Sequence, residues 1–134
     1  MWSYEHEVTT PATPAAVYAR YADVASWPEW DASVAAVTLD GPFAAGASGT
    51  LAIVDIPETI PFRITAAEPD RGFDDESHAF GHVLRFSHRL EVVSGGTRIR
   101  HRVEVEGPAA AEVGAGVVAD MPEAMKALAR AAGA

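Results

Sequence analysis

The stretch HVLRFSHRLEVVSGGTRIRHRVEVEG, residues 82–107, decides the fold because it predicts a long β-hairpin. Apolar and polar side chains alternate along both halves, as is typical of strands with one buried face. Gly95 and Gly96 lie between the halves and form a strong two-residue turn signal. We therefore expect strands over 82–93 and 97–107, with Ser94 opposite Thr97.

This register separates an apolar inner face from a charged outer face. On the inner face, we expect His88 opposite Val103 and Leu90 opposite His101, so that the two histidines lie diagonally, roughly 7 Å apart. A slip by one residue would exchange the two faces, so agreement on both faces supports the alternation. The expected outer-face pairs are Glu91–Arg100 and Arg85–Glu106.

The segments around the hairpin complete an α+β pattern. A strand is expected from Trp2, which is followed by a helix over 14–24 with Thr13 as its N-cap. One or two helical turns should carry Trp27 and Trp30. Further strands are expected over 33–39, 50–55, 61–68 and 73–78. The remainder after Gly107-Pro108 is helical, with a kink or restart at Pro122. A curved antiparallel sheet wrapped around a C-terminal helix satisfies this order, and its concave side leaves space for a cavity.

Composition excludes several classes of protein. The 134 residues are 49% hydrophobic, which predicts a single domain over 1–134 with a real core. The chain has no cysteine, which excludes disulfides and thiolate metal sites. A net charge of −9 argues against nucleic acid and anionic membranes as partners. No apolar run approaches the ~20 residues of a membrane span. We expect a cytoplasmic monomer or homodimer without membrane insertion.

The order and spacing of five segments resemble a known superfamily. These segments are TPAAVYARYADVASWPEWDASV (13–34), LDGPFAAGASGTL (39–51), FDDESHAFGHVLRFSHRLE (73–91), TRIRHRVEVEGP (97–108) and MPEAMKALARAA (121–132). They resemble the SRPBCC superfamily of START/Bet v 1-like helix-grip proteins, and within it the polyketide cyclase/dehydrase-type branch. The resemblance implies a seven-stranded sheet around a long C-terminal helix, with two short helices after the first strand.

The resemblance also implies an apolar ligand, such as a lipid, polyketide or isoprenoid, between sheet and helix. Trp27 and Trp30 would then brace one end of the cavity, although ordinary core packing is an alternative for both. The residues that we expect to line the cavity are Trp27, Trp30, Phe62, Phe73, Leu84, Phe86, Val103, Val117, Met121 and Met125.

The candidate catalytic residues are His88, His101 and Asp75. His88 and His101 share the inward parity of their strands, and His6 has inward parity on the first strand. Histidine is the usual general acid or base near neutral pH. If the preceding hairpin turns at Phe80-Gly81, Asp75 lies across from Phe86, near enough to orient His88. An inert, half-buried role is the alternative for each histidine taken singly.

Other chemistry has little support in the sequence. There is no P-loop or dinucleotide fingerprint, and the histidine spacing matches no metal motif, so we expect neither a cofactor nor a metal. His78 and His82 flank a turn and are expected to be solvated or at the cavity mouth.

Three functions fit these features. The first is binding of a hydrophobic small molecule. The second is a cyclase, aromatase or dehydratase that uses the inner histidines. The third is a protein-interaction domain, which predicts a filled interior and an exposed apolar patch.

Overall fold

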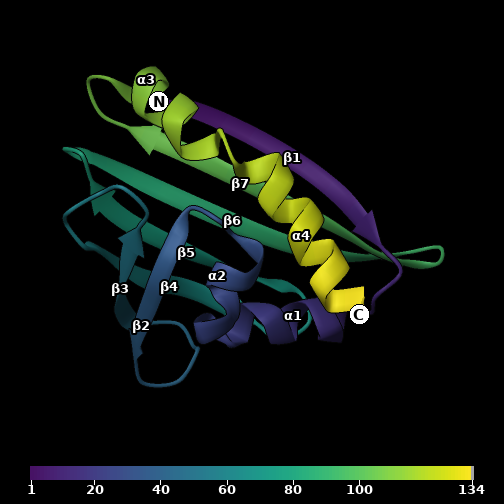
Figure 1. Cartoon of the computed structure of the whole chain (residues 1–134). Helices are drawn as coiled ribbons and strands as arrows, with labels where there is room; N and C mark the ends of the chain where they lie inside the picture. Colours follow the sequence, from purple (N-terminus) through teal and green to yellow (C-terminus); the bar gives the residue numbers. More distant parts are fainter. Residues whose placement is uncertain (134) are drawn as a thin grey trace.

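The computed structural model describes residues 1–133 and contains one curved antiparallel sheet (Figure 1). Its seven strands lie in the order β1-β7-β6-β5-β4-β3-β2. Their bounds are β1 (Trp2–Thr10), β2 (Val34–Asp40), β3 (Ser48–Ile53), β4 (Ile60–Glu68), β5 (Gly72–Ala79), β6 (His82–Val93) and β7 (Gly96–Glu106). These strands and the helices that cover one face of the sheet confirm the predicted α+β architecture. Alternation along the strands makes that face apolar, so it is buried against the helices.

Two short helical segments follow β1. They are α1 (Pro14–Ala22), and then the 3-10 helix η1 (Val24–Ser26) running into α2 (Trp27–Trp30). Thr13 caps α1 as predicted, since its side chain accepts a hydrogen bond from the Ala16 amide. The Ser26 side chain does not cap α2, because its hydroxyl donates to the Asp23 carbonyl oxygen. Trp27 and Trp30 are nevertheless both buried.

The C-terminal helix is bent into α3 (Ala110–Val118) and α4 (Met121–Gly133). The break falls just before Pro122, where a kink or restart was predicted. In Figure 1, α3 lies over β1 and β7, and α4 runs diagonally toward α1. Gly114 of α3 has no room for a side chain, because a Cβ atom would lie 2.2 Å from the Trp2 ring. This glycine therefore lets α3 pack closely on β1.

The β6–β7 register differs by two residues from the prediction. His88 pairs directly with His101, and the turn residues are Ser94 and Gly95. The cause is Gly96, where a Cβ atom would lie 1.9 Å from the Thr10 carbonyl oxygen. Gly96 thus belongs to β7, where the end of β1 requires a glycine, and not to the turn. A shift of two residues keeps every side chain on its predicted face.

The interior consists of two clusters of buried side chains. The larger cluster is aromatic and lies under α1, α2 and α4, around Tyr21, Trp27 and Phe73. The smaller cluster is aliphatic and lies under α3. Met121, at the start of α4, packs against both clusters and is only partly buried. No helix within residues 1–133 is both long enough and apolar enough to cross a membrane.

Candidate functional site

Three histidines form a row across the inner face of the sheet. The register pairs His6 with His101 and His101 with His88, so the row crosses β1, β7 and β6. It continues to Phe73 on β5, which pairs with His88. The predicted inward placement of all three histidines is confirmed, and the corrected register brings them closer than the expected diagonal. The ring centroids of His88 and His101 are 4.6 Å apart.

Tyr21 of α1 contacts this row from the helical side. Its hydroxyl lies 2.7 Å from Nε2 of His101, and both side chains are buried. Its ring also packs at 5.4 Å from His88 and at 5.0 Å from Phe73, measured between centroids. Tyr21 therefore supplies the hydrogen-bond partner that a buried histidine needs.

His88 is fixed in one orientation by Phe73. The two rings stack at 3.9 Å, and Nδ1 of His88 lies 2.9 Å from the Phe73 carbonyl oxygen. A carbonyl oxygen only accepts hydrogen bonds, so Nδ1 carries the proton and Nε2 is an acceptor in the neutral ring.

Asp75 lies at the centre of the inner face. It pairs with Phe86 on β6, as predicted from a turn at Phe80-Gly81, and with Ile64 on β4. Its Oδ1 is 4.0 Å from Nδ1 of His88, which is too far for a hydrogen bond. Because the Phe73 carbonyl oxygen already occupies Nδ1, the expected orientation of His88 by Asp75 is wrong.

Burial shifts the pKa values of Asp75, His88, His101 and Tyr21 so as to favour their uncharged forms. It raises the pKa of Asp75 to about 8, with a smaller contribution from the neighbouring charge of Asp74. Burial lowers the pKa of His88 to about 4 and holds the pKa of His101 well below its usual value. Burial also raises the pKa of Tyr21 far above its usual value. The cause throughout is that a low-dielectric interior penalises the charged form.

Two further polar atoms in this interior have no partner among residues 1–133. They are Nε1 of Trp30 and Oγ of Ser77, both buried. Asp75 likewise has no hydrogen bond within the described part of the chain. Most buried polar groups in proteins are paired, so unpaired groups call for an explanation. We did not select Ser77 from the sequence, although its inward parity beside Asp75 was visible.

The predicted lining residues separate into the two clusters. Those in the aromatic cluster are Trp27, Trp30, Phe62, Phe73 and Met125. Those in or against the aliphatic cluster are Leu84, Phe86, Val103, Val117 and Met121. Phe86, Val117 and Met121 are partly exposed, whereas the other members are buried. Of these three partly exposed residues, Met121 packs against both clusters.

Two pockets of the described residues open to the surface. One, of about 260 Å³, lies mainly on the outer face of the sheet around Asp74, Arg85 and Arg102, and Asp75 and Phe86 also line it. The other is an open groove of about 780 Å³ between the start of α1, the β4–β5 loop and the part of β6 next to its turn into β7. On the inner face, the side chains of Tyr21, Phe73 and Met125 are fully buried.

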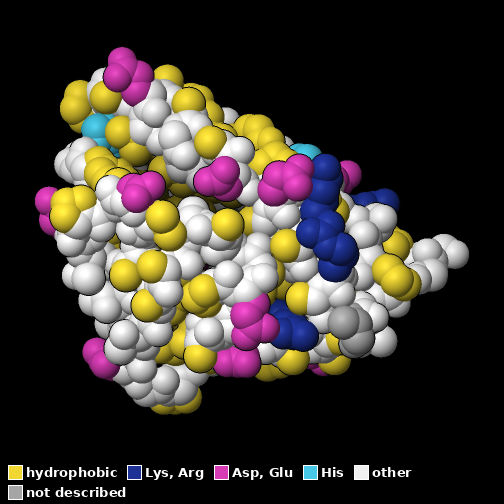
Figure 2. All heavy atoms as spheres, in the orientation of Figure 1, with side chains coloured by type: hydrophobic (Ala, Val, Ile, Leu, Met, Phe, Trp, Pro, Cys, Tyr) yellow, Lys and Arg dark blue, Asp and Glu magenta, His cyan; other side chains and the backbone are white. Residues whose placement is uncertain are grey.

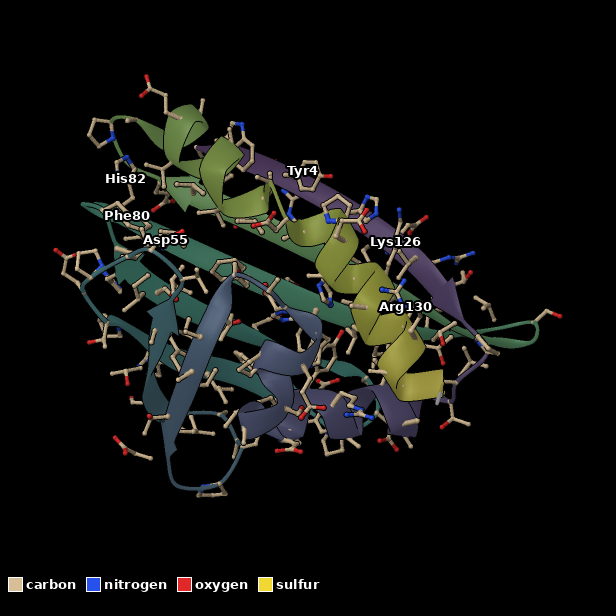
Figure 3. All side chains as sticks on the ribbon, viewed as in Figure 1. Tyr4, Asp55, Phe80, His82, Lys126 and Arg130 are labelled. Atoms are coloured by element: carbon tan, nitrogen blue, oxygen red, sulfur yellow. The ribbon has the colours of Figure 1, made fainter. Side chains whose placement is uncertain are left out.

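His82 differs from its expected solvated role. It is buried, and its Nε2 accepts a hydrogen bond from the Ala109 amide at 2.9 Å, while Nδ1 donates to the Phe80 carbonyl oxygen at 2.7 Å. Figure 3 shows His82 and Phe80 together at the β5–β6 turn, beside the chain that enters α3. His82 thus fastens the beginning of α3 to the sheet, whereas His78 is exposed as expected.

The sheet, the bent C-terminal helix and the polar row beneath α1 define a helix-grip protein of the SRPBCC superfamily. A family model described as "Polyketide cyclase / dehydrase and lipid transport" matches residues 1–133, and the chain belongs to this family. Members of such families bind hydrophobic ligands.

Solved structures show the same fold at low sequence identity. Protein MLL2253 from Mesorhizobium loti has a TM-score of 0.81 at 15% identity, covering 97% of this chain and 96% of its own. Ara h 8.0201 has a TM-score of 0.76 at 18% identity, covering 98% and 97%. DynU16, described as a protein in the dynemicin biosynthetic locus, has a TM-score of 0.75 at 19% identity. This chain is covered to 96% in that match but spans only 46% of DynU16. A search of curated proteins finds no match.

Proposed function

We propose that this protein binds an apolar small molecule between the inner face of the sheet and α3–α4. The observations that carry the proposal are two buried polar atoms without a partner in the described chain, Oγ of Ser77 and Nε1 of Trp30, and the buried carboxyl group of Asp75, within an otherwise aromatic interior. Each unpaired buried group costs about 1–3 kcal/mol. A ligand with a polar end would supply the missing partner, and its apolar body would pack against the aromatic and aliphatic clusters.

A ligand must displace side chains to enter, and the junction of α3 and α4 is where displacement costs least. Met121 lies there, touches both clusters and is partly exposed. The preceding helix is weak, because Gly114 and Gly116 both lower its intrinsic helix propensity. We infer that the ligand enters beside Met121 and reaches Asp75 along the boundary between the clusters.

The family description supports an apolar ligand of this kind, since it names both polyketide chemistry and lipid transport. The locus of DynU16 points in the same direction. The exposed apolar side chains, by contrast, give the interaction-domain hypothesis little support. The large ones are Met1, Val54, Phe80 and Val92, which come from four separate segments.

Native mass spectrometry tests the binding proposal. Protein purified gently from its own host is weighed intact and again after denaturation, and the apo form is then offered the uncharged dye Nile red. We expect a discrete apolar adduct or dye binding. Met121→Trp should abolish binding by filling the entrance, whereas Val92→Trp on the exposed hairpin should retain it. A parent protein that carries no adduct and binds no apolar probe would overturn the proposal and favour the interaction domain.

Catalysis is a second candidate function, and the structure favours Asp75 as its proton donor and acceptor. A general acid or base works best when its pKa lies near the operating pH. Burial raises the pKa of Asp75 to about 8, while it lowers the pKa of His88 to about 4. The histidines would then position the substrate by hydrogen bonding. A cyclase or dehydratase step needs such proton transfer next to a carbonyl group.

Proton exchange tests this second function without a known substrate. 2-Tridecanone is incubated with the protein in heavy water, and deuterium uptake beside its carbonyl group is followed by mass spectrometry. We expect the parent to accelerate the exchange and Asp75→Asn to lose the acceleration. If the parent and Asp75→Asn exchange deuterium at equal rates, at concentrations where the ketone is bound, the catalytic role of Asp75 is excluded and the binding function alone remains.

A further inference from the structure

The interior of the grip contains no lysine or arginine side chain within residues 1–133. All ten Lys and Arg residues of the chain lie within this range, and none is buried. Six of them are on the outer face of the sheet: Arg63, Arg85, Arg89, Arg98, Arg100 and Arg102. Figure 3 shows Lys126 and Arg130 on α4, and Figure 2 shows basic side chains gathered on the surface over this helix. Arg20 donates to the Ala131 carbonyl oxygen at the end of α4, and Arg71 lies in the exposed β4–β5 loop.

The one fully buried acidic side chain of the described residues faces this interior. Asp75 has Phe73 and Ser77 as its neighbours on the same face of β5, and Ile64 and Phe86 opposite it. No Lys or Arg side chain of the described chain contacts its carboxyl group, and Nδ1 of His88, 4.0 Å away, donates to the Phe73 carbonyl oxygen instead. Its surroundings are therefore apolar, which favours the protonated carboxyl group.

The groups that remain open to a ligand are uncharged. Ser77 and Trp30 offer an O–H and an N–H, and both atoms are buried without a partner. The protonated carboxyl group of Asp75 offers a further O–H, and Nε2 of His88 is an acceptor because Nδ1 donates to Phe73. A hydroxyl or carbonyl oxygen can pair with uncharged donors and acceptors of this kind.

We propose that the site around Asp75 and Ser77 takes an uncharged hydroxyl or carbonyl group of an apolar ligand and excludes ligands that carry a carboxylate. The inference rests on the proposed function and narrows its ligand class. A carboxylate would lose its hydration inside the grip and find no cation there, which is costly for any buried charge. A hydroxyl or carbonyl group brings no such penalty.

A matched series of probes tests this selectivity. Dodecanol, 2-tridecanone, dodecanoate and dodecylamine share a similar chain and differ at the polar end. Each competes with Nile red for the parent protein at pH 7, below the critical micelle concentration of the probe. We expect the alcohol and the ketone to bind about tenfold or more tightly than dodecanoate and dodecylamine.

Ser77→Ala should weaken the affinity for the alcohol about fivefold, as loss of one hydrogen bond does. Ser87→Ala, on the outer face of β6, is the matched control and should change nothing.

The outcomes separate failure of this inference from failure of the proposed function. If dodecanoate binds as tightly as dodecanol, and the protein without competitor binds Nile red, the selectivity is overturned and the proposed ligand binding stands. Dodecylamine that binds most tightly, and loses this advantage in Asp75→Asn, also overturns it and indicates a cation site. Absence of any binding, dye included, overturns both. Circular dichroism and thermal unfolding of Ser77→Ala verify that the variant is folded.

Discussion

The two faces of the sheet treat polar groups in opposite ways. On the outer face, arginines and carboxylates form cross-strand pairs, for example Arg85–Glu76 at 3.2 Å and Arg89–Asp74 at 2.7 Å. On the inner face of the same β5 strand, the Ser77 hydroxyl has no partner in the described chain, and Asp75 has only the nitrogen Nδ1 of His88 at 4.0 Å, beyond hydrogen-bond distance. One strand thus carries satisfied polar groups on one side and unsatisfied polar groups on the other.

This contrast distinguishes structural polar groups from functional ones. Exposed ion pairs contribute little each, since water stabilises the separated charges almost as well. Buried unpaired groups lower stability, and proteins that retain them often do so at functional sites. In our proposal, the unpaired groups of the inner face lower the stability of the protein and are kept because they bind the ligand. Substitutions on the two faces should differ in both the size and the direction of their effects.

Asp75→Asn should give the largest effect, and it should stabilise the protein in alkaline solution. Burial raises the pKa of Asp75 from 3.8 to about 8, so the unfolded chain ionises at lower pH than the folded protein. Stability contributed by the protonated carboxyl group is present below pH 4 and is lost as the pH rises to 8. We expect the free energy of unfolding of the variant to exceed that of the parent by about 2–5 kcal/mol at pH 8 and by much less at pH 4.5.

Urea unfolding across this pH range checks the prediction. The acid limb is the internal control: the pKa values of His88 and His101 are lowered, so their contributions are lost as the pH falls below 6.5 in both proteins. A parent–variant difference that stays constant from pH 4.5 to 8 would show that Asp75 is ionised in the folded protein.

Tyr21→Phe should produce the next largest effect, a loss of stability. The substitution removes the hydroxyl group at 2.7 Å from Nε2 of His101 and leaves that buried nitrogen without a partner. We expect a loss of about 1–3 kcal/mol in the free energy of unfolding, measured by urea titration at pH 7. Tyr18→Phe on the same helix is the control, because no hydrogen bond of the Tyr18 hydroxyl is found in residues 1–133. Equal effects of both variants would contradict the role of the Tyr21–His101 contact.

Ser77→Ala should stabilise the protein slightly, against the usual direction for a buried substitution. Its hydroxyl group is buried without a partner, so removing it relieves a desolvation penalty. We expect a gain of about 0.5–1 kcal/mol at pH 7, together with the weaker alcohol binding described above. A loss of stability instead would indicate that the hydroxyl group has a partner in solution, such as water.

The faces themselves were predictable from the sequence because they depend on strand parity alone. Alternation placed His6, His88 and His101 inside, whereas the inward placement of Asp75 also required a turn at Phe80-Gly81; all four residues are on the inner face. The β6–β7 register was not predictable from the hairpin alone. It depends on Gly96, which must be a glycine because β1 ends against it, 86 positions earlier in the chain at Thr10.

The partners of the inner groups were beyond sequence reasoning for the same physical reason. The Tyr21 hydroxyl meets a histidine 80 residues away, and Nδ1 of His88 binds the Phe73 backbone rather than the Asp75 side chain. A backbone carbonyl group leaves no mark in the sequence pattern. Parity therefore gives the face of a residue, and only the packing of α1 on the sheet gives its contacts.

The smallest effect is expected on the outer face, from Arg89→Gln. This arginine makes two hydrogen bonds to Asp74, at 2.7 and 3.1 Å, which is the best geometry of the outer pairs. It is nevertheless about half exposed, so water can replace the lost contacts. We expect a loss of less than about 1 kcal/mol in urea unfolding, and still less at 1 M NaCl, where the charges are screened. A loss as large as that of Tyr21→Phe would remove the distinction between the two faces, because Asp74 would then behave as a buried group in need of its partner.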